Sequence, residues 1–222
     1  MKNKFVASDW IVLSLVIIPL IYLTVIYSGL PAIVPTHFNL KGEADDTSVK
    51  SALWLATGLI GILSILLYLL LKFLPSIDPK KQVKYGAASF KKIAIGVVFL
   101  LFLINCMIIR SAETGSFESG NALPIAMGLF FAFMGNVMYS IKPNYFAGIR
   151  TPWTLESDDT WRETHRLAGK LWFAGGIIIA LCGLIFSFSI AIIILIAVTI
   201  IITVWPVVFS YTYFKGHQNK KD

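Results

Sequence analysis

Long runs without a charged side chain are the feature that most constrains how this chain can fold. No Asp, Glu, Lys or Arg occurs in residues 10–30, 51–71, 93–109, 121–141 or 171–214. About 20 consecutive apolar residues in a helix, each rising about 1.5 Å, cross the hydrocarbon core of a bilayer. The runs therefore predict an all-α integral membrane protein. The share of charged residues agrees, at 14% against about 25% in soluble domains.

The last run is about twice as long as one span requires, so we expect it to divide at a tight turn near Phe186-Ser187-Phe188-Ser189. Six transmembrane helices in a single polytopic domain, residues 1–222, are then predicted. Their approximate bounds are 10–29, 51–74, 92–109, 122–141, 170–187 and 190–214. Small residues four apart, Gly128 with Ala132 and Gly176 with Ala180, predict close contacts between helices.

Positive charges predict how the six spans are oriented. Only Lys41, Lys50 and Arg110 fall in the first and third loops; every other Lys and Arg falls in the termini or in the second and fourth loops. Cytoplasmic loops of membrane proteins are enriched in these residues. We therefore expect both termini and the loop 142–170 in the cytoplasm, and the loop 30–50 outside. The net charge of +7 then reflects orientation and contact with membrane lipids, not direct nucleic acid binding.

The outer loop, 30–50, combines prolines, turn residues and a small polar cluster. Pro31 and Pro35 favour an extended entry, and residues 39–42 are typical of a turn. One imidazole and three carboxylates gather in this loop, from His37, Glu43, Asp45 and Asp46. Such groups bind several divalent ions, but the chain has no repeated His spacing. A hydrogen-bonded loop without a metal is the preferred interpretation.

The inner loop, 142–170, is predicted to contain the start of a helix. Ser157 is a capping residue, and the acidic residues that follow it oppose the helix dipole. Helical periodicity places Trp161 and His165 on one face and two arginines on a neighbouring face. We expect a short amphipathic helix at the membrane surface before the fifth span, with aromatic rings among the headgroups and cations near phosphates.

Upstream of that helix, Arg150 and Trp153 are candidates for binding. The guanidinium could stack on the indole or clamp a carboxylate or phosphate, and His165 with Glu163 and Arg166 could handle a proton. A hydrolase also needs a positioned nucleophile, a base and an oxyanion stabiliser, while capping accounts for the nearby hydroxyls. We therefore predict no catalytic residues, no cofactor and no enzymatic activity.

The interior of the predicted spans argues against one class of transporter. No ionisable residue occupies a mid-span position, where Asn105 and Asn136 are the notable large polar side chains. Ion-coupled transporters place ionisable groups near the bilayer midplane. A membrane enzyme or a small-molecule carrier that uses the Arg150–His165 region is the alternative function that the residues leave open.

Two motifs resemble a known family. The inner loop reads Lys142-Pro143-Asn144-Tyr145-Phe146-x-Gly148-Ile149-Arg150-Thr151-Pro152-Trp153-Thr154-Leu155, then Trp161-Arg162-x-Thr164-His165-Arg166-x-x-Gly169-Lys170, and is similar to the signature of the SdpI family. The outer string Pro35-Thr36-His37-Phe38-Asn39-x-x-Gly42 resembles the N-terminal membrane module often found in the same proteins. The segment 156–160 departs from the family pattern but keeps its acidic first turn.

The resemblance implies a multi-pass immunity protein of the bacterial cell membrane, which protects the cell from a secreted, membrane-active toxin peptide. It also implies a receptor role, in which a small cytosolic winged-helix repressor is held at the membrane. The outer loop would then meet the toxin, with the candidates Pro35, His37, Asn39 and Gly42. The signalling candidates in the inner loop are Asn144, Gly148, Arg150, Thr151, Pro152, Trp153, Trp161, Thr164, His165 and Arg166.

Overall fold

The computed structural model describes residues 5–77, 87–116 and 121–218, and most of them are helical. The helices are α1 (Ala7–Ile26), α2 (Ala52–Ile77), α3 (Ala87–Thr114), α4 (Ala122–Met138), α5 (Pro152–Glu156), α6 (Asp158–Ile185) and α7 (Phe188–Gln218). A 3₁₀ turn, η1 (Tyr27–Gly29), follows α1. The two strands are β1 (Ile33–Phe38) and β2 (Ala44–Val49).

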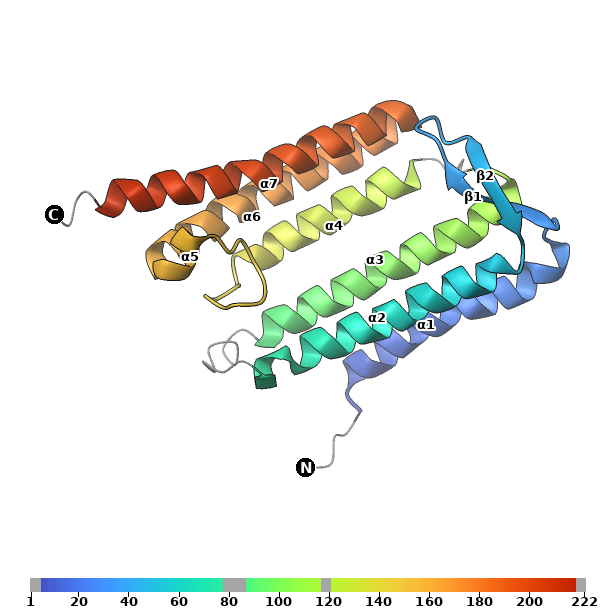
Figure 1. Ribbon diagram of the computed structural model, residues 1–222, viewed down its shortest axis with the longest axis horizontal. Helices are drawn as coiled ribbons and strands as arrows, with labels where there is room; N and C mark the ends of the chain where they lie inside the picture. The colour runs from blue at the N-terminus through green and yellow to red at the C-terminus, as the bar shows by residue number, and fades with distance from the viewer. Residues whose placement is uncertain (1–4, 78–86, 117–120, 219–222) are drawn as a thin grey trace.

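Five of these helices are long and apolar enough to cross a membrane: Ala7–Gly29, Ala52–Leu74, Ala88–Thr114, Asp158–Ile185 and Phe188–His217. The protein is therefore a multi-span membrane protein. The sixth predicted span corresponds to α4, a shorter apolar helix that ends at Met138 and not at residue 141. Whether α4 crosses the whole bilayer stays a prediction; α4 lies between α3 and α6 and is shorter than either (Figure 1).

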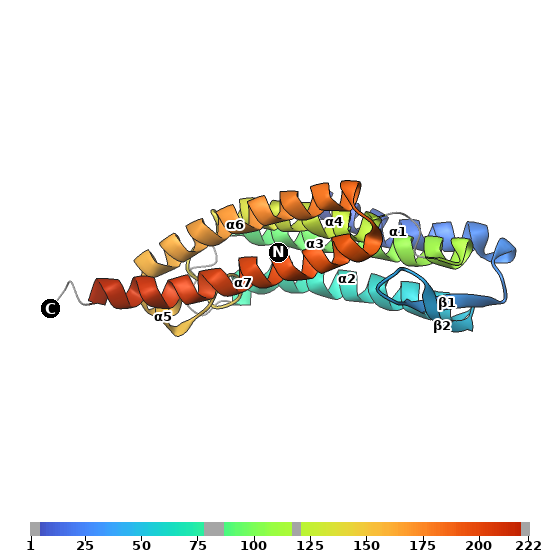
Figure 2. The same ribbon diagram turned by 90° about the horizontal axis from the view of Figure 1, so that it is seen from above.

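The helices lie roughly side by side in two groups, α1–α3 and α4 with α6 and α7, which meet where α3 packs on α4 (Figure 1). The strands lie at one end of the bundle, here called the hairpin end. Both ends of the described chain and the connection between α4 and α6 lie at the other, the terminal end (Figures 1 and 2). The long helices therefore run between the hairpin end and the terminal end (Figure 1).

A buried apolar cluster lies near each end of the bundle. At the hairpin end, Leu23, Val34, Leu53 and Ile109 join α1, β1, α2 and α3. At the terminal end, the buried cluster is formed by α3, α4, α6 and the segment between α4 and α6, through Ile93, Val137, Met138, Ile141, Trp161 and Ala168. Each end of the bundle therefore has its own buried apolar cluster.

Glycine allows α4 and α6 to approach backbone to backbone. A Cβ added to Gly135 would lie 2.4 Å from Phe173 N, and one added to Gly176 would lie 2.3 Å from Ala132 N. Gly128 meets the backbone at Ala180 in the same way. These contacts confirm the close packing that the small-residue spacing predicts.

Two expected features differ in the structure. The short interfacial helix before the fifth span is not a separate element, because α6 runs unbroken from Asp158 to Ile185 once Ser157 Oγ has accepted the Thr160 N–H. The outer loop forms an antiparallel hairpin, in which Ile33 pairs with Val49. The polar, exposed strand β2 lacks the alternating apolar pattern by which strands are recognised.

Within the last run, α6 and α7 are separated at residues 186–187, inside the expected turn.

Candidate functional site

The turn of the hairpin is organised by the side chain of Asn39. Its Oδ1 accepts hydrogen bonds from Lys41 N at 2.8 Å and Glu43 N at 3.2 Å, and its Nδ2 donates to Glu43 Oε2 at 3.0 Å. Gly42 has a φ of 81°, a left-handed conformation that costs other residues energy. Asn39 and Gly42 therefore fix the shape of the loop that joins β1 to β2.

His37 projects from β1 toward the second strand and into solvent. Its Nδ1 lies 2.5 Å from Asp45 Oδ1, and 70% of the His37 side chain is exposed. Among the described residues, His, Cys, Asp and Glu side chains form no group of three or more that could hold a metal ion. The acidic cluster of the outer loop thus supplies an exposed hydrogen-bonding partner for His37 at the hairpin.

A pocket of about 490 Å³ lies beneath the hairpin, here called the hairpin pocket. Both groups of helices line it: α2 and α3 contribute Leu53, Ala56 and Ile108, and α4 and α7 contribute Leu123, Phe188 and Ile192. From the predicted candidates, Pro35, His37 and Asn39 line it as well. The pocket lies within the range of about 300–1,000 Å³ that ligand sites occupy, and its walls are mostly apolar.

Gly42 is not in the wall of the hairpin pocket but holds the turn against it. A Cβ at Gly42 would lie 3.4 Å from Cδ1 of Phe188, the first residue of α7. The turn of the hairpin therefore rests on the start of α7. The four outer candidates are thereby assembled around one apolar cavity with a polar rim.

At the terminal end, Asn144 organises the first part of the α4–α6 connection, residues 139–157. The side chain is 4% exposed. Its Nδ2 donates to the carbonyls of Lys142 at 2.8 Å and Ala147 at 3.0 Å, and its Oδ1 accepts from the N–H groups of Phe146 and Ala147, both at 2.7 Å. Asn144 thus satisfies backbone groups that would otherwise lack partners.

Gly148 and His165 meet at the centre of this connection. The φ of Gly148 is 110°, and a Cβ there would lie 2.3 Å from His165 Nε2. The neighbouring Ile149 N–H donates to Nε2 at 3.0 Å, while His165 Nδ1 lies 2.9 Å from the Trp161 carbonyl. Since Nε2 accepts, the hydrogen bonds assign the proton to Nδ1 and a neutral ring.

Trp161 completes the contact between α4 and α6. Its indole N–H donates to the Ile141 carbonyl at 3.0 Å, just beyond the end of α4. Its ring stacks on that of His165, with centroids 4.1 Å apart, and both side chains are at most 2% exposed. The face of α6 that was expected to lie among lipid headgroups is therefore buried in the protein.

Hydroxyl groups attach α5 to α7. Thr151 is the N-cap of α5: its Oγ1 accepts from Thr154 N at 3.2 Å and lies 3.1 Å from Ser210 Oγ on α7. Thr154 Oγ1 donates to the Ile149 carbonyl at 2.8 Å. Thr154 and Ser210 were not among the expected site residues. The pattern Thr-Pro-x-Thr, with Pro152 at the first helical position, is the capping signal that points to Thr154.

The inner-loop candidates, from the α4–α6 connection and the start of α6, divide by burial. Asn144, Thr151, Trp161, Thr164 and His165 are buried, and Trp153 packs against Tyr211 with ring centroids 5.0 Å apart. Thr164 is fully buried, and its Oγ1 has no hydrogen-bond partner among the described residues. Arg150, Pro152 and Arg166 are exposed. Arg150 donates to the Tyr145 carbonyl, so the expected stacking of Trp153 on Arg150 is replaced by packing on α7.

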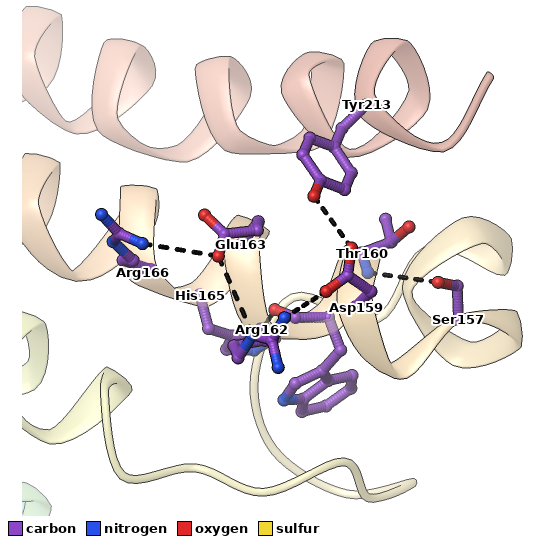
Figure 3. Close-up of polar contacts among 9 residues, drawn as sticks. Ser157, Asp159, Thr160, Arg162, Glu163, His165, Arg166 and Tyr213 are labelled. Atoms are coloured by element: carbon purple, nitrogen blue, oxygen red, sulfur yellow. Dashed lines mark hydrogen bonds and ion pairs between the residues drawn. The ribbon is translucent and has the colours of Figure 1, made fainter. Parts of the chain in front are cut away.

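The expected proton-handling group does not form. Figure 3 shows Glu163 directed to Arg166, at 3.5 Å, while Asp159 accepts from Arg162 and, at 2.9 Å, from Tyr213. Both ring nitrogens of His165 bond to the backbone of the chain instead. The prediction that His165, Glu163 and Arg166 cooperate is therefore wrong. The ring is buried against Gly148 and Trp161, whereas the half-buried Glu163 carboxylate is directed to Arg166.

Comparison with known proteins gives results that agree with both motifs. Residues 140–210 match the SdpI/YfhL protein family, and residues 14–61 match a domain of unknown function, DUF1648. The chain is 24% identical over 206 residues to a protein of Bacillus subtilis (strain 168) named "Immunity protein SdpI", an alignment that covers 92% of this chain and 95% of the relative. No solved structure matches the chain. The resemblance drawn from the two motifs is confirmed.

Proposed function

We infer a function from the premise that this chain is a distant homologue of the immunity protein SdpI, in the SdpI/YfhL family with an N-terminal DUF1648 domain. That function is the protection of a bacterial cell from a secreted, membrane-active toxin peptide. Homology supports an immunity-type function at the level of the family. The proposal goes beyond this homology in three respects: the toxin as ligand, the bacterial cell membrane as location, and the site of contact.

The hairpin pocket is the observation that carries the proposal. It is about 490 Å³ in volume, is walled by apolar side chains, and has polar groups at its rim. A membrane-active peptide offers apolar side chains, and burying one of them in such a pocket is favourable by about 25 cal/mol per Å² of apolar surface. The pocket draws its walls from both helix groups, so a bound side chain would contact both.

The orientation follows the distribution of positive charge. Lys and Arg concentrate in the loops and termini at the terminal end, which the positive-inside rule places in the cytoplasm. Part of that charge, on Lys80, Lys81 and Lys84, lies outside the described residues. With this orientation the hairpin pocket faces outward, where a secreted peptide arrives.

The test compares two tryptophan substitutions one residue apart on α2. Ala56 lines the hairpin pocket, whereas Leu55 is 67% exposed and does not. We expect cells that express Ala56→Trp to lose protection against a toxin peptide, because the indole fills the cavity. Cells with Leu55→Trp at equal membrane abundance should survive like the wild type. Equal survival of both variants would contradict the pocket, and failure of the wild type to protect would contradict the function against that toxin.

A second role, as receptor for a cytosolic repressor, is supported by a small exposed surface on the α4–α6 connection. Tyr145 and Leu155 are each 44% exposed, and Arg150 is exposed beside them in the sequence. Aromatic and arginine side chains are enriched at protein contact sites. The buried candidates would hold this surface in shape without touching the partner.

This role predicts a difference between two exposed arginines. We expect Arg150→Ala to lower recruitment of a fluorescently labelled winged-helix repressor to membranes that contain toxin. Arg162→Ala, on α6 outside this surface, should leave recruitment unchanged. Equal recruitment by the two variants would remove the surface from the proposal while leaving the protection assay unaffected.

A further inference from the structure

A polar cluster joins α1 and α2 at the terminal end, away from the hairpin pocket and the α4–α6 connection. Asp9, in the first turn of α1, is 9% exposed. Its Oδ1 accepts from Tyr68 Oη and from Lys72 Nζ, both at 2.5 Å, and its Oδ2 accepts from Val6 N at 2.9 Å. The chain's own donors thus occupy both carboxylate oxygens.

Lys72 keeps capacity for a second anionic partner. Its ammonium carries three N–H groups, and Asp9 is the acceptor it contacts among the described residues. The side chain is 33% exposed, and Nζ lies 5.6 Å from the ring centre of Tyr68 and 5.8 Å from that of Phe73. Lys72 is therefore held in place by aromatic rings at the edge of the bundle.

Two cavities adjoin Lys72. The larger, of about 620 Å³, is a groove between α1 and α2 with mainly apolar walls, including Val12, Leu13, Ile65 and Leu69. Leu13 and Leu69 are 37% and 39% exposed, so the groove opens on the outer side of two membrane-spanning helices. Its polar end is formed by Asp9 and Lys72. The groove is thus amphipathic along the membrane normal.

The smaller cavity, of about 210 Å³, brings a second cation to the same place. Lys72 and Lys91 both line it, together with the hydroxyl-bearing residue Ser8. Asp9 neutralises one of the two ammonium groups, which leaves a single positive charge over. A phosphate diester carries a single negative charge, so the charges balance when one such group lies between the lysines.

We propose that an anionic phospholipid of the leaflet at the terminal end binds in this groove. The phosphate would lie between Lys72 and Lys91, and an acyl chain would fill the apolar part between α1 and α2. A soluble anion would use only the polar end, whereas a lipid matches both the cations and the apolar walls. Lysines at a membrane surface attract anionic lipids. The inference does not depend on the immunity function, since the residues that line these two cavities are not those that line the hairpin pocket.

The first experiment removes one cation and compares it with its neighbour. Lys91 and Lys92 are adjacent and exposed on α3, but only Lys91 lines the cavity. Detergent-purified full-length protein with added phosphatidylglycerol is examined by native mass spectrometry. We expect Lys91→Ala to weaken retention of the lipid about fivefold and Lys92→Ala to leave it unchanged. Equal losses in the two variants would mean general charge attraction and would overturn the site.

The second experiment fills the groove. Leu69 lines it, while Leu70 is 53% exposed and lies outside it. We expect Leu69→Trp to weaken phosphatidylglycerol retention at least as much as Lys91→Ala does, and Leu70→Trp to have no effect. Inorganic phosphate should not displace the lipid, and phosphatidylcholine should be retained less well. Displacement by phosphate, or equal retention of the two lipids, would overturn the proposal.

Discussion

The hairpin and the α4–α6 connection, taken with the start of α6, are both polar and built around an asparagine, a glycine of positive φ and a histidine. They use these residues in opposite ways. His37 is 70% exposed and pairs with a carboxylate, whereas His165 is 2% exposed and bonds to two backbone groups. A Cβ added to Gly42 would make an ordinary contact with Phe188, whereas Gly148 has no room for a Cβ. The hairpin exposes its polar side chains to solvent, whereas those of the second region are buried and hydrogen-bonded within the protein.

This difference shows that a long motif with many distinctive side chains does not by itself locate a binding surface. The connection carries the longer family motif, but its most distinctive side chains hold α4, α6 and α7 together. The hairpin carries the shorter motif and borders the open pocket. A function that needs contact with a partner is therefore better placed at the hairpin and at the few exposed residues of the connection.

The largest expected loss of stability is for Gly148→Ala. The new Cβ would clash with His165 Nε2, and the left-handed backbone would be strained, so we expect the free energy of unfolding to fall by about 2–4 kcal/mol. Thermal unfolding in detergent measures it. Gly216→Ala is the control, because a Cβ there meets nothing within 4 Å. Similar unfolding temperatures for the two variants would contradict the close contact.

The two histidines sharpen the comparison. We expect His165→Ala to lower the free energy of unfolding by about 2–3 kcal/mol, because it leaves the Ile149 N–H without its acceptor and removes a buried ring. We expect His37→Ala to cost at most about 1 kcal/mol, because both side chains of the His37–Asp45 contact are exposed to water. The same thermal assay applies. A larger loss for His37→Ala would reverse the contrast between the two ends.

The two asparagines should differ in the same sense by a smaller amount. We expect Asn144→Ala to cost about 1–3 kcal/mol, since buried backbone groups lose their partners. Asn39→Ala should cost less than about 1 kcal/mol, because water can reach its turn. Hydrogen exchange of the two turns, measured by mass spectrometry, should rise strongly for 144–147 and weakly for 39–43. Equal changes would show that burial does not decide the cost.

The sequence was sufficient to predict the class of protein and much of the helix arrangement. Uncharged runs mark the long helices, the small residues of α4 and α6 mark their contact, and Ser157 marks the start of α6, because each signal acts locally. Hairpin pairing escaped prediction, since β2 is polar and exposed on most positions. Its register depends on Asn39 and Gly42 and on packing against α7.

The role of the connection was harder to predict for a physical reason. Trp161 and His165 on one helical face suit either a membrane surface or a protein core, and periodicity alone cannot separate the two. The decision depends on Gly148, whose missing side chain admits the imidazole, and on Ile141, whose carbonyl receives the indole. These partners lie far from α6 in the sequence.

The helix α7 is a single rod that touches both ends of the molecule. Phe188 at its start supports the hairpin turn, and Ser210 near its other end contacts the cap of α5. Pro206 lies within the helix between them, where the proline ring leaves one backbone carbonyl of the helix without its usual N–H donor. One continuous helix therefore joins the turn of the outer motif to the α5 cap in the inner motif.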